Sequence, residues 1–226
     1  RLVVLDRTLT ATLYNVATRR VVRVLRGHEF FVDRAVFSPD GRLVASADVG
    51  GVIKVWSGRG GRELIETGGL AWASNYSPDG RQLSYGPCGA GVFVCDAESG
   101  RRLLQLHEER QFSYLARFSP NRRHLATQDA TGAVSIWDLE AGARVHRWQC
   151  HQRTLWALNY SPNGRHLVTG SRDRTVGIWD TQTGALQHVL RGHSFWLTSA
   201  EFSPDGHWLA TGAVEDPYAG LWKVES

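Results

Sequence analysis

Three side chains in one short stretch of the sequence carry the groups of a hydrolytic active site. His151 supplies an imidazole, Thr169 a hydroxyl and Asp173 a carboxylate. In hydrolases such a base activates the hydroxyl, and the carboxylate orients the base. Trp179 adds an indole N–H that could donate to the same network. The first hypothesis for these residues is therefore nucleophilic catalysis.

The same set of groups recurs along the chain, but with substitutions. His193, Thr211, Asp216 and Trp222 repeat it with one residue inserted before the tryptophan. The other units keep parts of it or none: His28, Ser46, Gly50 and Trp56; Thr67, Tyr85, Gly89 and Cys95; Glu109, Thr127, Thr131 and Trp137. A catalytic site would not tolerate such substitutions between the repeats of one chain, whereas a stabilising network would. We therefore prefer a structural role and predict no catalytic residue.

A repeat of about 42 residues positions these side chains. A Ser-Pro-Asp-Gly turn or a close variant begins at five serines: Ser38, Ser77, Ser119, Ser161 and Ser203. The steps between them are 39, 42, 42 and 42 residues. Each is followed 18 or 19 residues later by a tryptophan or a cysteine: Trp56, Cys95, Trp137, Trp179 and Trp222. Self-similarity at such a period indicates a repeat architecture.

One unit, residues 151–190, shows what each repeat contains. Four short apolar or alternating segments lie at residues 155–160, 166–170, 175–179 and 186–190. Turns rich in Pro, Asn, Asp and Gly separate them, which is the pattern of antiparallel strands. No segment of the chain has helical periodicity. The sequence thus predicts an all-β protein built from four-stranded units.

Two further signals complete the pattern. Gly-His precedes the turn serine by ten residues at His28 and His193, and Asp follows the tryptophan or cysteine at Asp96, Asp138 and Asp180. With these motifs the chain resembles the WD-repeat (WD40) β-propeller family over all 226 residues. The resemblance implies a propeller of four-stranded antiparallel blades.

We expect a single WD40 propeller domain over residues 1–226. Its expected parts are an incomplete blade at 1–26, blades at about 27–66, 67–106, 107–148 and 149–190, and an incomplete blade at 191–226. The chain begins at Arg1 in the middle of a repeat and contains no methionine. We therefore expect it to be part of a larger multidomain chain whose propeller ring has seven blades.

The resemblance also implies a structural use for the triad-like residues. In this family the carboxylate accepts from the histidine and the backbone, the hydroxyl extends the network, and the tryptophan donates to the hydroxyl. Two complete sets, which we call the structural tetrads, match: His151, Thr169, Asp173 and Trp179; His193, Thr211, Asp216 and Trp222. Buried networks of this kind set strand register, because an unpaired member is costly.

The resemblance places a second group of residues at the mouth of the central channel, where partners of such propellers dock. They stand five residues after the histidine position of each repeat: Asp33, Trp72, Tyr114, Trp156 and Thr198. Two positions earlier stand Phe31, Leu70, Phe112, Thr154 and Trp196. The rings could simply fill the channel. Aromatic rings beside a carboxylate are also suited to a Lys or Arg side chain of a partner.

Composition excludes several other classes. The net charge of +4 is the excess of 26 basic over 22 acidic residues, and the basic residues are spread through every repeat, so a solvated surface is favoured over nucleic-acid binding. Three cysteines without metal-ligand spacing favour a reducing, cytoplasmic location. The histidines do not form a ligand set, and we expect no metal and no cofactor. No apolar run approaches membrane-spanning length.

These observations together predict a non-enzymatic scaffold or sensor of signalling that binds a peptide or protein at the channel mouth. A propeller enzyme, either a hydrolase or a lyase, is the chief alternative. Such an enzyme needs convergent carboxylates, histidines or a metal at the channel, whereas the predicted channel positions supply only Asp33. Nucleic-acid binding through scattered arginines and a purely structural spacer are the remaining alternatives.

Overall fold

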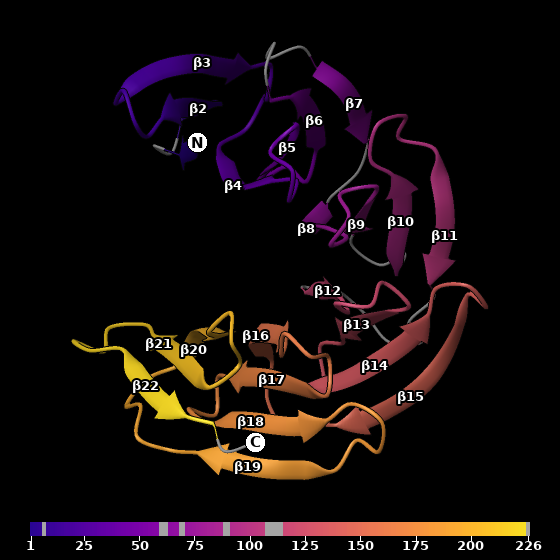
Figure 1. The fold of residues 1–226 in the computed structure, drawn as a ribbon, viewed down its shortest axis with the longest axis vertical. Coiled ribbons are helices and arrows are strands. Elements are labelled where there is room, and N and C mark those ends of the chain that lie inside the picture. The colour runs from indigo at the N-terminus through magenta and orange to yellow at the C-terminus, as the bar shows by residue number, and fades with distance from the viewer. Residues whose placement is uncertain (6–7, 59–62, 68–70, 88–90, 107–114, 225–226) are drawn as a thin grey trace. The chain divides into compact units, whose positions relative to one another are not determined.

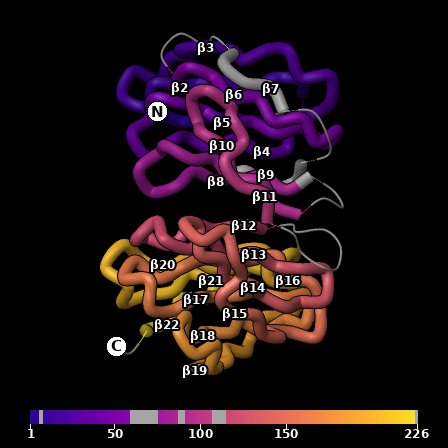
Figure 2. Tube along the Cα trace, turned by 90° about the vertical axis from the view of Figure 1, so that its right-hand side faces the viewer, coloured from indigo at the N-terminus to yellow at the C-terminus, as the bar shows by residue number. Residues whose placement is uncertain are grey.

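The protein is all-β in the part that the structure describes. The computed structural model describes residues 1–5, 8–58, 63–67, 71–87, 91–106 and 115–224, with the backbone alone for 63–67, 71–74 and 87. All its regular elements are strands, and none of the described segments is a helix that could cross a membrane (Figure 1). The chain divides into two compact units, Arg1–His107 and Glu108–Ser226 (Figure 2).

The first unit contains three antiparallel sheets. The first sheet has three strands, β1 (Leu2–Leu5), β2 (Thr10–Asn15) and β3 (Arg20–Arg26). The second has four, β4 (Val32–Phe37), β5 (Leu43–Asp48), β6 (Ile53–Ser57) and β7 (Glu63–Thr67). The third also has four, β8 (Ala71–Tyr76), β9 (Gln82–Pro87), β10 (Val92–Asp96) and β11 (Arg102–Leu106).

The second unit also contains three antiparallel sheets. The fourth sheet of the chain has β12 (Ala116–Phe118), β13 (His124–Gln128), β14 (Ala133–Asp138) and β15 (Ala143–Gln149). The fifth has β16 (Leu155–Tyr160), β17 (His166–Ser171), β18 (Val176–Asp180) and β19 (Leu186–Leu190). The sixth has three strands, β20 (Leu197–Phe202), β21 (Trp208–Ala213) and β22 (Gly220–Lys223). Four-stranded sheets flanked by two three-stranded ones confirm the predicted fold class.

The Ser-Pro turns join the first two strands of each repeat through the serine side chain. The Ser38 hydroxyl accepts the backbone N–H of Leu43 at 2.9 Å and donates to the Asp40 carboxylate at 2.6 Å. The other four turn serines accept the equivalent N–H at the same distance of 2.9 Å. These bonds satisfy polar groups at the end of the hairpin. The turn chemistry thus explains the recurrence of the motif.

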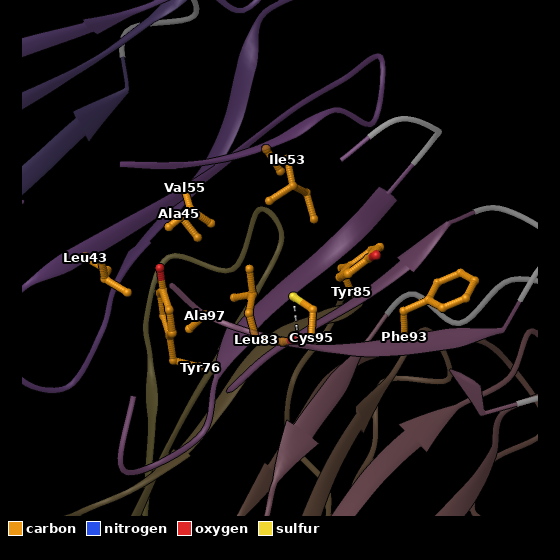
Figure 3. Packing of buried hydrophobic residues seen from close by; sticks show 11 residues of the cluster. Leu43, Ala45, Ile53, Val55, Tyr76, Leu83, Tyr85, Phe93, Cys95 and Ala97 are labelled. Carbon is orange, nitrogen blue, oxygen red and sulfur yellow. Dashed lines mark hydrogen bonds between the residues drawn. The ribbon is translucent and has the colours of Figure 1, made fainter. Parts of the chain in front are cut away.

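The hydrophobic cores lie between neighbouring sheets of each unit. Between the second and third sheets, Leu43, Ala45 and Val55 face a group that includes Leu83 and Cys95 (Figure 3). Cys95 occupies the tryptophan position of its repeat and is fully buried, and its thiol lies 3.5 Å from the carbonyl oxygen of Leu83. Similar clusters lie between the first and second, the fourth and fifth, and the fifth and sixth sheets. Burial of these apolar faces holds each sheet to its neighbour.

The first strands of four sheets, β4, β8, β16 and β20, share an irregularity near their beginnings. Pairing with the second strand shifts register at Asp33 in β4, at Trp156 in β16 and at Thr198 in β20. In β8 a shift covers the segment that contains Trp72. A bulge leaves one residue without an opposite partner and re-aims its side chain. Accordingly, Asp33, Trp156 and Thr198 are all exposed.

Candidate functional site

The four residues of the fifth-sheet tetrad form one chain of hydrogen bonds. His151 precedes β16, Thr169 lies on β17, Asp173 follows β17, and Trp179 lies on β18. The indole Nε1 of Trp179 donates to the Thr169 hydroxyl at 2.8 Å, and that hydroxyl lies 2.8 Å from Nε2 of His151. The opposite ring nitrogen, Nδ1, lies 2.8 Å from Oδ2 of Asp173. The network therefore ties three segments of one sheet together.

The environment of Asp173 favours its ionised form. Burial raises the pKa of the carboxyl group, but hydrogen bonds from His151 and Thr175 outweigh burial and lower the pKa to about 2. Thr175 contributes both its backbone N–H, at 2.9 Å, and its hydroxyl, at 2.6 Å. Asp173 is thus a charged acceptor that holds the turn between β17 and β18.

The sixth sheet repeats the network in spite of the inserted residue. Asp216 Oδ2 lies 2.6 Å from His193 Nδ1, and Thr211 Oγ1 lies 2.8 Å from His193 Nε2. Trp222 donates to the Thr211 hydroxyl at 2.8 Å. The longer turn between β21 and β22 therefore still returns its carboxylate to the histidine. Both sets of tetrad residues are brought together.

The second sheet also has a complete network, contrary to the expectation that Gly50 leaves it without a carboxylate. Asp48, at the end of β5, lies 2.8 Å from Nδ1 of His28, and Ser46 lies 2.7 Å from Nε2. At Gly50 there is no space for a side chain, because an added Cβ would lie 2.4 Å from the Phe30 ring. Asp48 therefore supplies the carboxylate from two residues earlier, which is a correction to the sequence-based interpretation.

In the fourth sheet, too, the carboxylate stands two residues after the hydroxyl residue, but it pairs with an arginine and not with a histidine. Trp137 donates to the Thr127 hydroxyl at 2.9 Å, as the pattern predicts. The buried carboxylate two residues after Thr127 is Asp129, which pairs with Arg147 on β15 at 2.7 Å and accepts the hydroxyl of Thr131. Burial raises the pKa of Asp129, but the bonds from Thr131 and Arg147 outweigh this effect and lower it. An arginine thus neutralises this carboxylate. Glu109 lies outside the described residues.

The third sheet differs from the others. Tyr85 and Phe93 fill the space beside β9 and β10 with stacked rings whose centroids are 5.5 Å apart. Nothing is described of the side chain of Thr67 or of Gly89. Apolar packing therefore replaces the hydroxyl and indole pair in this repeat.

The tetrad geometry resembles a catalytic triad, but access to it differs. Thr169 and Ser46 are fully buried, and each hydroxyl already accepts an indole N–H. A nucleophilic oxygen must reach an electrophilic atom of the substrate, whereas these two residues have no exposed surface. Among the described residues, no group of three His, Cys, Asp or Glu side chains is placed to hold a metal ion. The arrangement is suited to holding strands in register.

The predicted channel-mouth residues fall in both units, so their convergence on one spot stays a prediction. In the first unit, Phe31 and Asp33 are exposed, and the Asp33 carboxylate lies 3.8 Å from Nε of Arg34. In the second unit, 43% of Trp156 and 45% of Trp196 are exposed. Thr198 is exposed and Thr154 is partly buried. Three positions, Leu70, Phe112 and Tyr114, and the Trp72 side chain lie outside the described residues.

One member of this surface was not predicted from the sequence. The guanidinium carbon of Arg172 lies 3.8 Å from the centre of the Trp196 ring. The backbone N–H of Arg172 donates to the carbonyl of Thr154 at 3.1 Å, two residues before Trp156. Arg172 thus links the beginnings of β16 and β20, whose strands are neighbours. Its only sequence signal is its place in the tight turn after β17.

The comparison with known families agrees with this architecture. The family model described as WD domain, G-beta repeat matches residues 19–57, 142–180 and 184–223, which together make up slightly more than half of the chain. No curated protein matches the chain significantly. Repeats of this family generally mediate protein–protein interactions. With its repeated turns, its tetrads and its four-stranded sheets, the chain belongs to the WD-repeat family.

Proposed function

We propose that this protein is a non-enzymatic scaffold or sensor in signalling that binds a peptide or protein partner at the channel-mouth face, where the first strands of the sheets begin. The observation that carries the proposal is the register shift at the beginning of the first strands. It places Trp156 on the surface of the second unit, next to the loop that carries Trp196. Exposed tryptophans held by strands bind partners with little loss of conformational entropy.

The partner group expected at Trp156 is a Lys or Arg side chain. An exposed indole attracts a cation by roughly 0.5–2 kcal/mol. Asp33 is the one carboxylate among the predicted channel-mouth positions. One face of the Trp196 ring is covered by Arg172.

The alternatives have less support. A hydrolase or lyase would need an accessible nucleophile or a set of converging polar groups, and the tetrad hydroxyls are buried. Nucleic-acid binding would rest on arginines that are distributed over many strands. A cytoplasmic location is part of the proposal and rests on the cysteine pattern, in which Cys95 and Cys150 are free thiols.

Binding of peptides to wild type and to three tryptophan variants tests the proposal. Calorimetric titration with a panel of basic, acidic and apolar peptides should identify at least one that binds. Trp156→Ala should weaken that binding by about 2 kcal/mol or more, the scale of an interface hot spot. Trp208→Ala is the matched control, because Trp208 is exposed to a similar extent, 42%, at the opposite end of its sheet.

Folding must be followed in the same samples. Trp179→Ala should unfold at lower denaturant concentration, because it removes a buried ring and the donor to Thr169. Trp156→Ala should unfold as wild type does. Equal affinities of folded wild type and folded Trp156→Ala would reduce the exposed rings to channel filling and would contradict the proposal.

A further inference from the structure

Arg172 is held in one orientation by the chain itself. Its backbone donates to Thr154, and its guanidinium group stacks on the ring of Trp196 with 3.8 Å between the guanidinium carbon and the ring centre. Stacking on an aromatic face uses the flat side of a guanidinium and leaves its N–H groups in the plane available for hydrogen bonds. Arg172 therefore presents an ordered guanidinium group, and little conformational entropy would be lost when a ligand binds to it.

The described part of the chain provides no anion for this guanidinium group. No carboxylate there forms an ion pair with Arg172, and its Nε is buried without an acceptor. Two other arginines of the same unit do have such partners, since Arg147 lies 2.7 Å from Asp129 and Arg123 lies 3.1 Å from Asp138. Because the buried Nε is out of a ligand's reach, an incoming oxyanion would pair with the other N–H groups of this partly exposed side chain.

Two more arginines lie on the same loops. The Ser171 hydroxyl is within 3.3 Å of the Arg153 carbonyl, and the Arg174 N–H donates to the Ser171 carbonyl at 3.1 Å. Both Arg153 and Arg174 are exposed, and neither has an ion pair with any described residue. The carboxylate between them in sequence, Asp173, is already bound by His151 and Thr175. This leaves an excess of positive charge.

The surroundings of the arginines are partly apolar. Trp156, Phe195 and Trp196 are each exposed by more than two fifths. Glu215, on the turn between β21 and β22, is exposed and forms no ion pair with a described residue. Arg172 stacked on Trp196, with Arg153 and Arg174 on the same loops, is complementary to a segment that carries both carboxylates and apolar side chains.

We infer that the surface formed by Arg153, Arg172, Arg174, Trp156 and Trp196 binds an acidic segment of a protein partner, with a carboxylate of Asp or Glu at the guanidinium of Arg172. This inference rests on the proposed function and names the chemistry of the partner. The carboxylate accepts two N–H groups of Arg172, and apolar side chains of the same segment contact Phe195 and Trp196, while Trp156 takes the partner cation of the proposed function. A partner cation at Trp156 and a carboxylate at Arg172 occupy different places on the surface.

Fluorescence anisotropy with two labelled peptides tests the inference on the whole chain. One peptide alternates Glu and Leu, and the other has the same length with Lys in place of each Glu. The acidic peptide should bind at least about tenfold more tightly than the basic one. Arg172→Gln should weaken its binding by about tenfold or more, the effect expected for a lost charge-assisted hydrogen bond. Arg172→Lys should recover only part of the wild-type affinity, because an ammonium group cannot form the bidentate hydrogen bonds or the planar stacking of a guanidinium.

A matched control separates this site from general charge attraction. Arg144→Gln removes the same charge from the same unit, and Arg144 also lies over a tryptophan, 5.7 Å from the Trp137 ring centre, but on the outer strand β15. It should leave the affinity within about twofold of wild type, since distant surface charges are screened. Equal losses in Arg172→Gln and Arg144→Gln would overturn the inference. Thermal unfolding of each variant checks that it is folded.

Other outcomes distinguish this inference from the proposed function. If the basic peptide binds as tightly as the acidic one and Trp156→Ala weakens both, the interaction surface stands and the acidic preference is wrong. If neither peptide binds and the wider peptide panel also fails, both are wrong. A labelled single-stranded oligonucleotide is the third probe. If it binds more tightly than the acidic peptide and loses affinity in Arg172→Gln, the ligand is a nucleic acid and the inference is wrong.

Discussion

Oδ2 of Asp48 lies 2.8 Å from Nδ1 of His28, although the repeat pattern puts the carboxylate of this unit at position 50. The imidazole continues to Ser46, and Trp56 donates to the same serine hydroxyl at 2.8 Å. Both members of the Asp48–His28 pair are almost completely buried. The network in the second sheet is therefore equivalent in its bonds to that of the fifth, while its carboxylate comes from a different position of the repeat.

Removal of the Asp48 carboxylate should destabilise the fold. Asp48→Ala leaves the buried His28 ring and the Val52 N–H without their acceptor, so the free energy of unfolding should fall by about 1–3 kcal/mol. Urea unfolding followed by tryptophan fluorescence measures the change. Asp33→Ala is the control, since Asp33 is exposed, and it should change stability by no more than about 0.5 kcal/mol. Equal stabilities of the two variants would contradict the role of Asp48.

Stability should depend on pH through Asp173. The pKa of this group is lowered from 3.8 to about 2 in the folded chain, so the unfolded chain binds the proton more readily. The stabilisation is fully present above the unfolded pKa of about 4 and is lost as the pH falls toward about 2. Urea unfolding at a series of pH values should show this fall in wild type.

Variants of Asp173 identify the source of that pH dependence. Asp173→Asn should be less stable at neutral pH and should show a shallower fall between about pH 4 and pH 2. Asp173→Ala should lose about 1–3 kcal/mol at neutral pH. Asp33→Asn should keep the wild-type profile. An Asp173→Asn profile parallel to that of wild type would show that other carboxylates cause the acid sensitivity.

The Asp129–Arg147 pair should contribute more than an exposed pair does. Arg147→Ala leaves the buried Asp129 carboxylate without its cation, so the free energy of unfolding should fall by about 1–3 kcal/mol. Arg123→Ala removes an exposed arginine that pairs with Asp138, and it should lower the free energy of unfolding by less than about 1 kcal/mol. The double variant Asp129→Ala with Arg147→Ala should lose less than the sum of the single variants. Strict additivity would exclude direct coupling of the pair.

A side-chain relay joins the first strands of the second unit. Arg117 Nε donates to Asn159 Oδ1 at 2.8 Å, and Asn159 Nδ2 donates to the Ala200 carbonyl at 2.8 Å. Asn159→Ala should lower the free energy of unfolding by about 1–2 kcal/mol because both bonds are lost. Asn159→Asp should lose less, since it keeps the acceptor for Arg117. Unfolding of Asn159→Ala at the wild-type urea concentration would show that the relay is not stabilising.

The sequence by itself determined the strand order of each repeat and the positions of the turn serines, because hydrogen-bonding motifs and alternating apolar residues depend on neighbours in the same hairpin. It also predicted which residues supply the hydroxyl, imidazole and indole of the tetrads, because their spacing follows from adjacent antiparallel strands. The position of Trp156 at the channel mouth was an expectation from the family resemblance, and in the structure Trp156 is exposed at the register shift in β16.

The tertiary structure decided which side chains complete the networks. Asp48 faces His28 where residue 50, a glycine covered by the Phe30 ring, has no carboxylate to offer. Arg172 lies on Trp196, which is 24 residues later in the sequence and in the next sheet. Contacts of this kind depend on how neighbouring sheets pack and on the volume left between them, and a periodic pattern along one chain contains neither quantity.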